Sequence, residues 1–539
     1  MARRNGLAVA VVGASAFLLR LAILPFCPVP LPFCPDDFSF LLAANTFAAG
    51  RLTNPTPAMW VHFESIHITM KPTYMSMYFP AQGLLLAAGK VLTGHPWYAV
   101  LVVTACLCAA ICWALQAWLP PQWALLGGII AILHLGLFSA WINTYHTAGA
   151  VAGLGGALVI GAFPRLMRTV KFRYGLLLAL GIILLATSRP YEGLLLCLPI
   201  AFVLGRWAFF GEGRPSMSML ARRAALPLLL VIAAGAWMGY YDYRAFGSPL
   251  TPPYKVDRAT YAVAPYYVWQ PPRPVPNYRH PMLRRFYTVD ELKYYNQIHN
   301  LWGFLPQCLI KVIRGTIFFA GFALLPPLFM TKRVLMDRRV RFLVLCMYIM
   351  MAGMVIEIFL IPHYLAPFTI LFYGLGLQAV RHLWVWRPDG RPIGRTMVRL
   401  CMLICVVLAG VRVYAKPLHL VPAEFPPTNW FDNWYGPGPY GMARARVESH
   451  LEDLPGKQLV IVRYSDDHNP LDEWVYNAPD IDASKIIWAR DMGPEQNLQL
   501  IRYYKDRTVW LAQPDMHPAS LTPYVASSLP AARETAALK

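Results

Sequence analysis

Two adjacent carboxylates, Asp36 and Asp37, follow the first apolar stretch of the chain in the segment PFCPDDFSF, residues 32–40. A carboxylate at a membrane surface can act as a general base toward a hydroxyl group. Adjacent residues of an extended or turn segment point in different directions, so one acid would face the reacting hydroxyl and the other would hold it or the acceptor in place. The residue types do not decide which acid is the base, and our prediction is Asp37. The alternative is that the pair is simply solvated at the membrane boundary.

A second group of polar residues stands near the ends of later apolar stretches. It comprises Glu64 and Lys71 in WVHFESIHITMKPTY, His146 in NTYH, Arg189 and Glu192 in SRPYEG, and Glu357, His363 and Tyr364 in IEIFLIPHYLAP. Ionisable groups at membrane depth are costly and usually mark a function. Cations at this depth can hold the phosphate of a lipid whose tail lies in the bilayer. If these residues share one face of the membrane, they predict a polar cavity for transfer of a group from a phospholipid-like carrier.

Each of these residues also has a structural interpretation. Arg189 and Glu192 can form an ion pair, and Glu357 can pair with Arg189 instead. Histidines of the same loops can be hydrogen-bonded residues at the membrane interface: His62, His67 and His146. His363 and Tyr364 can be interface anchors.

The composition is that of a polytopic membrane protein. The chain has 539 residues, of which 57% are hydrophobic and only 14% charged, whereas soluble domains have about 25% charged residues. Apolar runs long enough to cross a bilayer recur through the first 415 positions. The net charge is +20, but many cations stand in short loops between apolar runs, as in cytoplasmic loops. We therefore expect no nucleic-acid partner.

The cation distribution also predicts a topology. We expect eleven membrane-spanning helices, at 7–26, 97–118, 122–141, 147–164, 174–188, 193–209, 224–243, 306–330, 342–361, 364–382 and 398–414. With the N-terminus inside, nearly every short cationic loop then lies inside. If the apolar stretch 79–93 also crossed, the loop TKRVLMDRRVR would face outward. We therefore expect 79–93 to be a re-entrant or juxtamembrane helix and the C-terminus to lie outside.

This topology gives a transmembrane domain over residues 1–415 and a soluble outer domain over 416–539. The outer parts of the first domain are 27–96 and 244–305, and the second domain reads as a small α/β layer of helix, two strands, helix and strand. The fold class is thus a mainly α transmembrane bundle with a small extracytoplasmic α/β domain. The long Pro- and Tyr-rich loop at 244–305 is predicted to be a lid, or else an ordered packing loop.

The layout resembles the GT-C superfamily of membrane glycosyltransferases, which includes the protein O-mannosyltransferases and the bacterial aminoarabinose transferases of lipid A. The matching pieces are PDDFSFLLAANTFAAGRL (residues 35–52), KPTYMSMYFPAQGLLLAAGKVLTG (residues 71–94) and the multi-span core. The resemblance covers about the first 415 residues. It is similar above all to uncharacterised bacterial members, which implies a bacterial inner membrane and an extracytoplasmic active site.

The resemblance implies an inverting transfer of a hexosyl or pentosyl group from a polyprenyl phosphate to an acceptor hydroxyl, with one acid of the Asp pair as general base. Lys71 is then the first choice for binding the phosphate, with Arg189 and His363 next, and Glu64 orients the acceptor or the sugar. Glu64 stands seven residues before Lys71, whereas the two look adjacent in the aminoarabinose transferases. Arg258 in the lid loop would reach lipid headgroups. No cofactor is expected, and no metal is required, although the oligosaccharyl branch uses one.

Two other classes remain as alternatives. One is a transporter or flippase of polyprenyl lipids or glycolipids, which an internal repeat in hydropathy would favour. The other is a non-catalytic protein of cell-envelope assembly, which would tolerate loss of Asp36 and Asp37. The acceptor itself, whether glycan, lipid or protein, is left open by the sequence.

Overall fold

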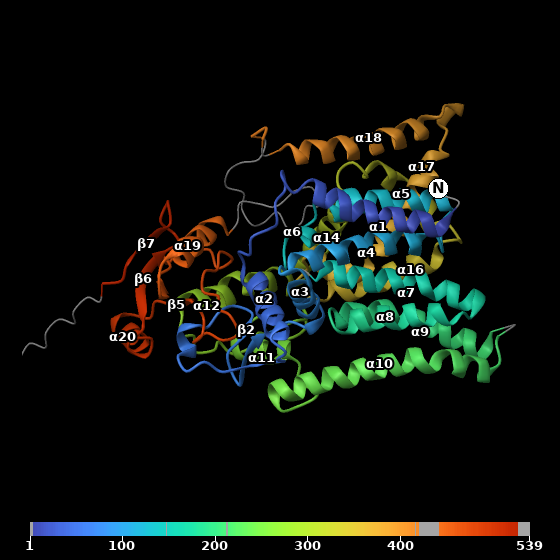
Figure 1. Cartoon of the computed structure of the whole chain (residues 1–539). Helices are drawn as coiled ribbons and strands as arrows, with labels where there is room; N and C mark the ends of the chain where they lie inside the picture. The colour runs from blue at the N-terminus through green and yellow to red at the C-terminus, as the bar shows by residue number, and fades with distance from the viewer. Residues whose placement is uncertain (1–3, 147, 212–213, 416, 420–440, 526–539) are drawn as a thin grey trace, which may run out of the picture.

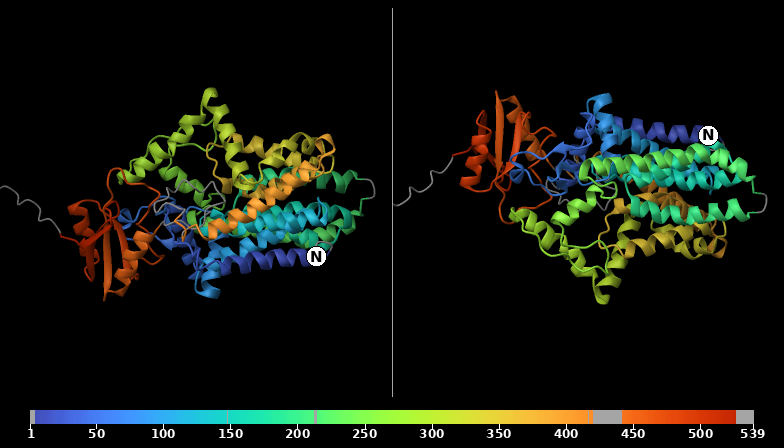
Figure 2. Two further views of the ribbon diagram at one scale, coloured as in Figure 1. Left: turned by 90° about the horizontal axis from the view of Figure 1, so that it is seen from above. Right: turned by 90° about the horizontal axis from the view of Figure 1, so that it is seen from below.

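The structure, a computed structural model, describes residues 4–146, 148–211, 214–415, 417–419 and 441–525. It consists of a helix bundle with a small sheet at one end, and the N-terminus lies at the opposite end of the bundle (Figures 1 and 2). The sides of the membrane on which the two chain ends lie stay a prediction.

The bundle is built from apolar helices. Among the described residues, seven are long and apolar enough to cross a membrane: α1 (Asn5–Ala22), α4 (Trp97–Leu115), α7 (Gly149–Thr169), α9 (Pro190–Phe210), α10 (Met217–Phe246), α14 (Leu301–Ala320) and α18 (Ile393–Val413). Shorter helices fill the remaining expected positions: α5 (Pro121–Ala131) continued by η2 (Ile132–Gly136), α8 (Phe172–Ala186), α16 (Arg341–Val355) and α17 (Thr369–Trp384). Each of the eleven expected spans therefore contains a helix, while the number of crossings stays a prediction.

Short elements connect these helices. They are η1 (Trp60–His62), α6 (Ala140–Asn143), η4 (Pro326–Met330), α15 (Thr331–Met336), η5 (Pro362–Phe368) and η6 (Pro388–Gly390). The glycine-rich sequence of α7 allows η5 to pack directly against it, because a Cβ on Gly156 would lie 1.9 Å from the carbonyl oxygen of Pro367. Small residues permit such close approach between membrane helices. This contact fixes the position of the predicted site residues His363 and Tyr364.

The first outer loop is folded around two helices and a small sheet. Helix α2 (Pro35–Ala48) begins with Pro at its first position and has Asp36 and Asp37 in its first turn, where negative charge is favourable. The strands β1 (Asn54–Pro55), β3 (Thr73–Ser76) and β2 (Ile68–Thr69) pair antiparallel in that order. Helix α3 (Pro80–Thr93) has 14 residues, or about 21 Å, which is shorter than a bilayer core of about 30 Å. The short helix expected at 79–93 is therefore present.

The segment 244–305 is not a structureless loop. It contains α11 (Pro253–Tyr261), α12 (Pro281–Arg285), η3 (Phe286–Asp290) and α13 (Leu292–Ile298). A backbone bridge between Tyr267 and Glu357 also ties it to the end of α16. The chain thus supplies an ordered wall beside the first outer loop.

The C-terminal part has the helix and strand order expected from its sequence. It contains α19 (Met442–Asp453), β4 (Lys457–Val462), β5 (Ile486–Arg490), α20 (Pro494–Tyr503), β6 (Arg507–Gln513) and one strand that was not expected, β7 (Ser520–Pro523). The sheet order is β5-β4-β6-β7, with β4 parallel to β5 and β6, and with β7 antiparallel. One apolar core joins this sheet to the first outer loop, since Leu459 and Ile487 cluster with Phe63 and Tyr74. The C-terminal layer is therefore packed onto the loop that carries the acid pair.

Candidate active site

A cavity of about 970 Å³ lies where the first outer loop, the segment 244–305, the outer ends of the bundle helices and the C-terminal layer meet. Its lining includes eight of the eleven residues predicted for the site: Asp36, His146, Arg189, Glu192, Arg258, Glu357, His363 and Tyr364. The other three, Asp37, Glu64 and Lys71, lie elsewhere. Residues separated by more than 320 positions thus share one polar cavity.

Asp36 faces this cavity from the first turn of α2. Its side chain is 17% exposed, and its Oδ1 lies 3.0 Å from Nδ1 of His67. The hydroxyl of Tyr78 donates a hydrogen bond to the same oxygen and lies 3.1 Å from the same imidazole nitrogen. Asp36 is therefore held by two neighbours through one carboxylate oxygen.

Asp37, the acid predicted to be the base, does not line this cavity. Its side chain is fully buried, and its Oδ1 accepts hydrogen bonds from the backbone N–H of Tyr145 and from Nδ1 of His146, each at 2.8 Å. The prediction assumed an extended or turn segment, but Pro35 starts a helix, in which consecutive side chains are about 100° apart. Asp37 fastens α2 to the turn at 139–146, and Asp36 is the acid that reaches the cavity.

His67 was assigned only a structural role from the sequence, yet it lines the cavity beside Asp36. Its φ of +63° is in the left-handed region, which is uncommon for residues other than glycine. The strained backbone is held because its carbonyl accepts hydrogen bonds from Ser39 Oγ at 2.7 Å and from the N–H of Met77 at 3.2 Å. Backbone strain of this kind concentrates at functional sites.

Burial and charge act in opposite directions on the Asp36–His67 pair. Burial alone would raise the pKa of Asp36, but the charge and hydrogen bond of His67 hold that pKa below its usual range. Burial would lower the pKa of His67, but Asp36, and then the charges of Asp257 and Glu291, raise it above its usual value. The two groups therefore titrate as a coupled pair.

Arg189, which precedes α9, is one of the cations that line this cavity. Its Nη1 lies 3.6 Å from Glu192 Oε1, and its guanidinium lies 4.4 Å from the ring centroid of Tyr364. Its side chain is 17% exposed, so it can still contact a ligand. The predicted ion pair is present, but its length leaves hydrogen-bonding capacity on the guanidinium.

Arg258 has a largely structural position at the cavity wall. Its guanidinium is buried, pairs with Glu291 and donates to the carbonyl of Ala264 at 2.7 Å. These contacts fasten α11 to η3 within the segment 244–305. Its predicted contact with lipid headgroups is therefore wrong in this structure, because a buried, paired guanidinium does not reach a headgroup.

On the opposite wall, His363 lies between the rings of two other predicted residues. Its centroid is 4.9 Å from that of Tyr364 and 6.3 Å from that of His146. Burial, followed by the charge of Arg189, lowers the pKa of His363 well below its usual value. A neutral His363 can hydrogen-bond a ligand but adds no charge to the cavity wall.

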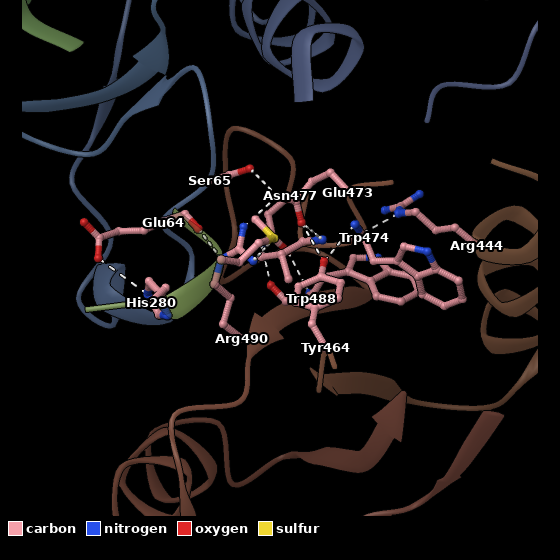
Figure 3. Close-up of polar contacts among 12 residues, drawn as sticks. Glu64, Ser65, His280, Arg444, Tyr464, Glu473, Trp474, Asn477, Trp488 and Arg490 are labelled. Atoms are coloured by element: carbon pink, nitrogen blue, oxygen red, sulfur yellow. Dashed lines mark hydrogen bonds and ion pairs between the residues drawn. The ribbon is translucent and has the colours of Figure 1, made fainter. Parts of the chain in front are cut away.

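Glu64 belongs to a different cluster, which joins the first outer loop to the C-terminal sheet (Figure 3). Its carboxylate accepts a hydrogen bond from the Tyr261 hydroxyl at 3.0 Å and lies 3.5 Å from His280 Nε2. Its backbone carbonyl accepts from Arg490, whose Nη2 pairs with Glu473 at 2.6 Å. Glu64 therefore anchors the first outer loop and does not line the large cavity, and its role in orienting the acceptor or the sugar stays a prediction.

Lys71 is also outside the large cavity. Its Nζ lies 4.2 Å from the ring centroid of Trp60, at a second cavity of about 260 Å³. The expectation that Lys71 binds the donor phosphate therefore does not fit a donor held in the large cavity, because Lys71 does not line that cavity.

One group of described residues has ligand types and spacing suited to a metal ion. The thiol of Cys34, a carboxylate oxygen of Asp37 and a ring nitrogen of His146 lie within 4.8 Å of one another, all buried. His146 Nδ1 lies 2.8 Å from Asp37 and 3.5 Å from Cys34 Sγ, which are hydrogen-bonding contacts. Of these three residues only His146 lines the large cavity, and the expectation that no metal is required stays a prediction.

No known protein family matches the chain, and no curated protein sequence matches it. Among solved structures, ArnT from Cupriavidus metallidurans bound to undecaprenyl phosphate aligns with 96% of this chain and 96% of its own, at 13% identity and a TM-score of 0.49. The oligosaccharyltransferase AglB from Archaeoglobus fulgidus, in complex with an inhibitory peptide and a dolichol-phosphate, aligns with 94% of this chain and 69% of its own, at 9% identity and a TM-score of 0.48.

The same archaeal oligosaccharyltransferase tethered with an acceptor peptide aligns with 86% of this chain, at 11% identity and a TM-score of 0.45, and this chain spans 62% of its length. These solved proteins are GT-C glycosyltransferases, the superfamily that the sequence resembles. Similarity this remote carries no argument about the reaction, which has to be inferred from the cavity.

Proposed function

We propose that this chain is an integral-membrane glycosyltransferase that moves a sugar from a polyprenyl phosphate to an acceptor hydroxyl on the outer face of a bacterial inner membrane. The observation that supports this most is that Asp36 and Arg189 line one cavity at the same end of an apolar helix bundle. An acid and a cation in that position suit deprotonation of a hydroxyl and departure of a phosphate. A cavity of about 970 Å³ is in the size range of ligand sites.

In the proposed reaction, the acceptor oxygen attacks the anomeric carbon of the donor sugar. The bond from this carbon to the phosphate oxygen breaks, its electron pair stays on the phosphate, and the configuration inverts. The proton of the acceptor hydroxyl passes to Asp36. Since Tyr78 and His67 both contact Oδ1 of Asp36, Oδ2 is the oxygen that we assign to this proton.

Arg189 compensates the charge that appears on the leaving phosphate. A charge-assisted hydrogen bond from its guanidinium would strengthen as the phosphate gains negative charge. Glu192 and the Tyr364 ring keep the guanidinium in place. The proposal needs no metal and no cofactor, because a cation already stabilises the leaving group.

Asp37 does not contact the substrate in this proposal but positions Asp36. Its bonds to Tyr145 and His146 hold the first turn of α2, and therefore the direction of Asp36. The acceptor class, whether glycan, lipid or protein, and the donor sugar, hexosyl or pentosyl, are left open by this arrangement.

The experiment that tests the function uses the purified full chain in lipid nanodiscs with a radiolabelled polyprenyl-phosphate sugar. Membranes of the native host in which the gene has been deleted supply the acceptor. The expected result is label in an acceptor fraction together with release of polyprenyl phosphate. Movement of the intact donor lipid across a proteoliposome membrane without transfer would instead support the transporter class.

A further inference from the structure

The second cavity, of about 260 Å³, lies between the first outer loop and the segment 244–305. Its polar and aromatic lining includes Trp60, Thr69, Lys71, Asn277, Tyr278 and Arg279. Among the described residues, it shares no lining residue with the large cavity. Its volume is below the roughly 300–1,000 Å³ of sites for drug-sized ligands, so it suits one small group rather than a lipid-linked donor.

Two cations stand over one aromatic ring at this cavity. Lys71 Nζ and the Arg279 guanidinium carbon lie 4.2 and 4.6 Å from the Trp60 ring centroid. Lys71 is exposed, and the Arg279 side chain is 49% exposed. The acid in the lining is Glu64. Its carboxylate lies 3.5 Å from the Arg279 guanidinium and also accepts a hydrogen bond from the Tyr261 hydroxyl. The lining therefore has one positive charge in excess, which favours an anionic ligand.

A buried hydroxyl of the lining lacks a protein partner. Thr69 is 1% exposed, and within the part of the chain that the structure describes, its Oγ1 has no hydrogen-bond partner. Buried polar groups are nearly always hydrogen-bonded, so an unpaired hydroxyl in a cavity wall indicates a polar ligand. The amide of Asn277 and the Tyr278 ring line the same space. Sugars present both hydroxyls and an apolar ring face, which matches this mixture of groups.

We propose that this second cavity binds an anionic sugar residue, a hexose phosphate or hexuronate, of the acceptor. That this sugar belongs to the acceptor rests on the proposed function. The binding of an anionic sugar in this cavity does not depend on sugar transfer. The phosphate or carboxylate meets Lys71 and Arg279, and a sugar hydroxyl meets Thr69 Oγ1.

The position of the cavity explains how it would serve the reaction. Helix α11 lines both spaces, since Arg258 and Tyr254 face the large cavity while Thr260 and Tyr261 face the small one. An acceptor anchored in the small cavity would therefore be held one helix away from Asp36.

The test measures binding of glucuronate, glucose 6-phosphate, glucose and inorganic phosphate to the full chain in nanodiscs by saturation-transfer NMR and calorimetry, without donor. Glucuronate and glucose 6-phosphate should bind, and glucose should bind at least tenfold more weakly. The double variant Lys71→Ala/Arg279→Ala should weaken both anionic sugars at least tenfold, and Thr69→Val should weaken them severalfold. Lys505→Ala, an exposed cation of the C-terminal layer, is the matched control and should change nothing.

Equal affinities in native and variant proteins would overturn the site, as would inorganic phosphate binding as tightly as glucose 6-phosphate, because that result describes an anion site without sugar recognition. Unchanged thermal unfolding of Thr69→Val checks that a loss is not misfolding. The Asp36→Asn variant should bind these sugars normally, so loss of transfer and loss of this site are distinguishable.

Discussion

Nδ1 of His67 lies 3.0 Å from Oδ1 of Asp36, and this contact joins a residue of the strained loop before β2 to the first turn of α2. The two side chains form a coupled acid–imidazole pair at the wall of the large cavity. When His67 is protonated, the ion pair neutralises Asp36 and weakens it as a base. With Asp36 as the base that we propose, the reactive form is ionised Asp36 beside neutral His67.

This pair predicts the pH dependence of transfer. Because Asp36 raises the pKa of His67 above its usual value, of about 6.5, single-turnover transfer should rise with pH through a midpoint above 6.5. In His67→Asn this rise in rate should change its midpoint, because Asp36 loses the imidazole that lowers its pKa and its own ionisation then sets the pH dependence. Transfer rates measured from pH 5 to 9 check this. If the rate of the variant rose over the same pH range as the native rate, His67 would not be coupled to Asp36.

The phosphate site predicts a loss of donor affinity. Arg189→Ala should weaken donor binding by about 1.5–3 kcal/mol, the range for a hydrogen bond to a charged group, or roughly 10- to 150-fold. Lys71→Ala should leave donor affinity unchanged, since Lys71 lines the other cavity. Equilibrium binding of a fluorescent polyprenyl-phosphate sugar measures both. A larger effect from Lys71 than from Arg189 would contradict the assignment.

The cluster between the first outer loop and the C-terminal sheet predicts a stability effect. Arg490 and Glu473 are 3% and 0% exposed and lie 2.6 Å apart. Arg490→Met leaves a buried carboxylate without its partner and should reduce stability by about 3–5 kcal/mol. Arg463→Ala, which breaks the half-exposed contact with Asp491, should cost at most about 1 kcal/mol. Thermal unfolding in nanodiscs that ranks the two variants equally would argue against a structural role for the cluster.

The topology predicts which positions a membrane-impermeant maleimide can label. Lys505→Cys in the C-terminal layer should react from outside, whereas Arg338→Cys, between α15 and α16, should react only after the membrane is opened. The one exposed native thiol of the described residues, Cys106, lies within α4, so the native chain is a usable background. Labelling of position 338 in intact cells would overturn the eleven-span arrangement.

Local patterns of the sequence predicted the bundle helices and most of the C-terminal layer, but not the helix α2 or the helices within 244–305. The alternation and turn residues around β4, β5 and β6 predicted the C-terminal layer, while the short edge strand β7 has no comparable pattern. The same holds for α3, whose length separates it from the spanning helices. Helix order and approximate bounds follow from hydropathy because each apolar helix carries its own signal.

The sequence predicted most of the residues that line the large cavity, but not which way each side chain points. Eight predicted residues meet because the topology gathers the outer helix ends. Asp36 lines the cavity and Asp37 does not, and Pro35 followed by acids is a helix-start signal that could have indicated their different directions. His67 and Tyr78 have no such signal, since their contact with Asp36 depends on how the loop folds back over α2. Glu64 and Lys71 face the neighbouring cavity for the same reason.

The most direct test of the account is single-turnover sugar transfer by Asp36→Asn and Asp37→Asn in matched, folded preparations. Asp36→Asn should reduce the rate by about 10²- to 10⁴-fold, the usual contribution of a general base, without changing donor affinity. Asp37→Asn keeps an oxygen for the Tyr145 N–H and should stay within about tenfold of the native rate, because its effect on the base is indirect. Native transfer by Asp36→Asn, or a greater loss in Asp37→Asn than in Asp36→Asn, would contradict Asp36 as the base.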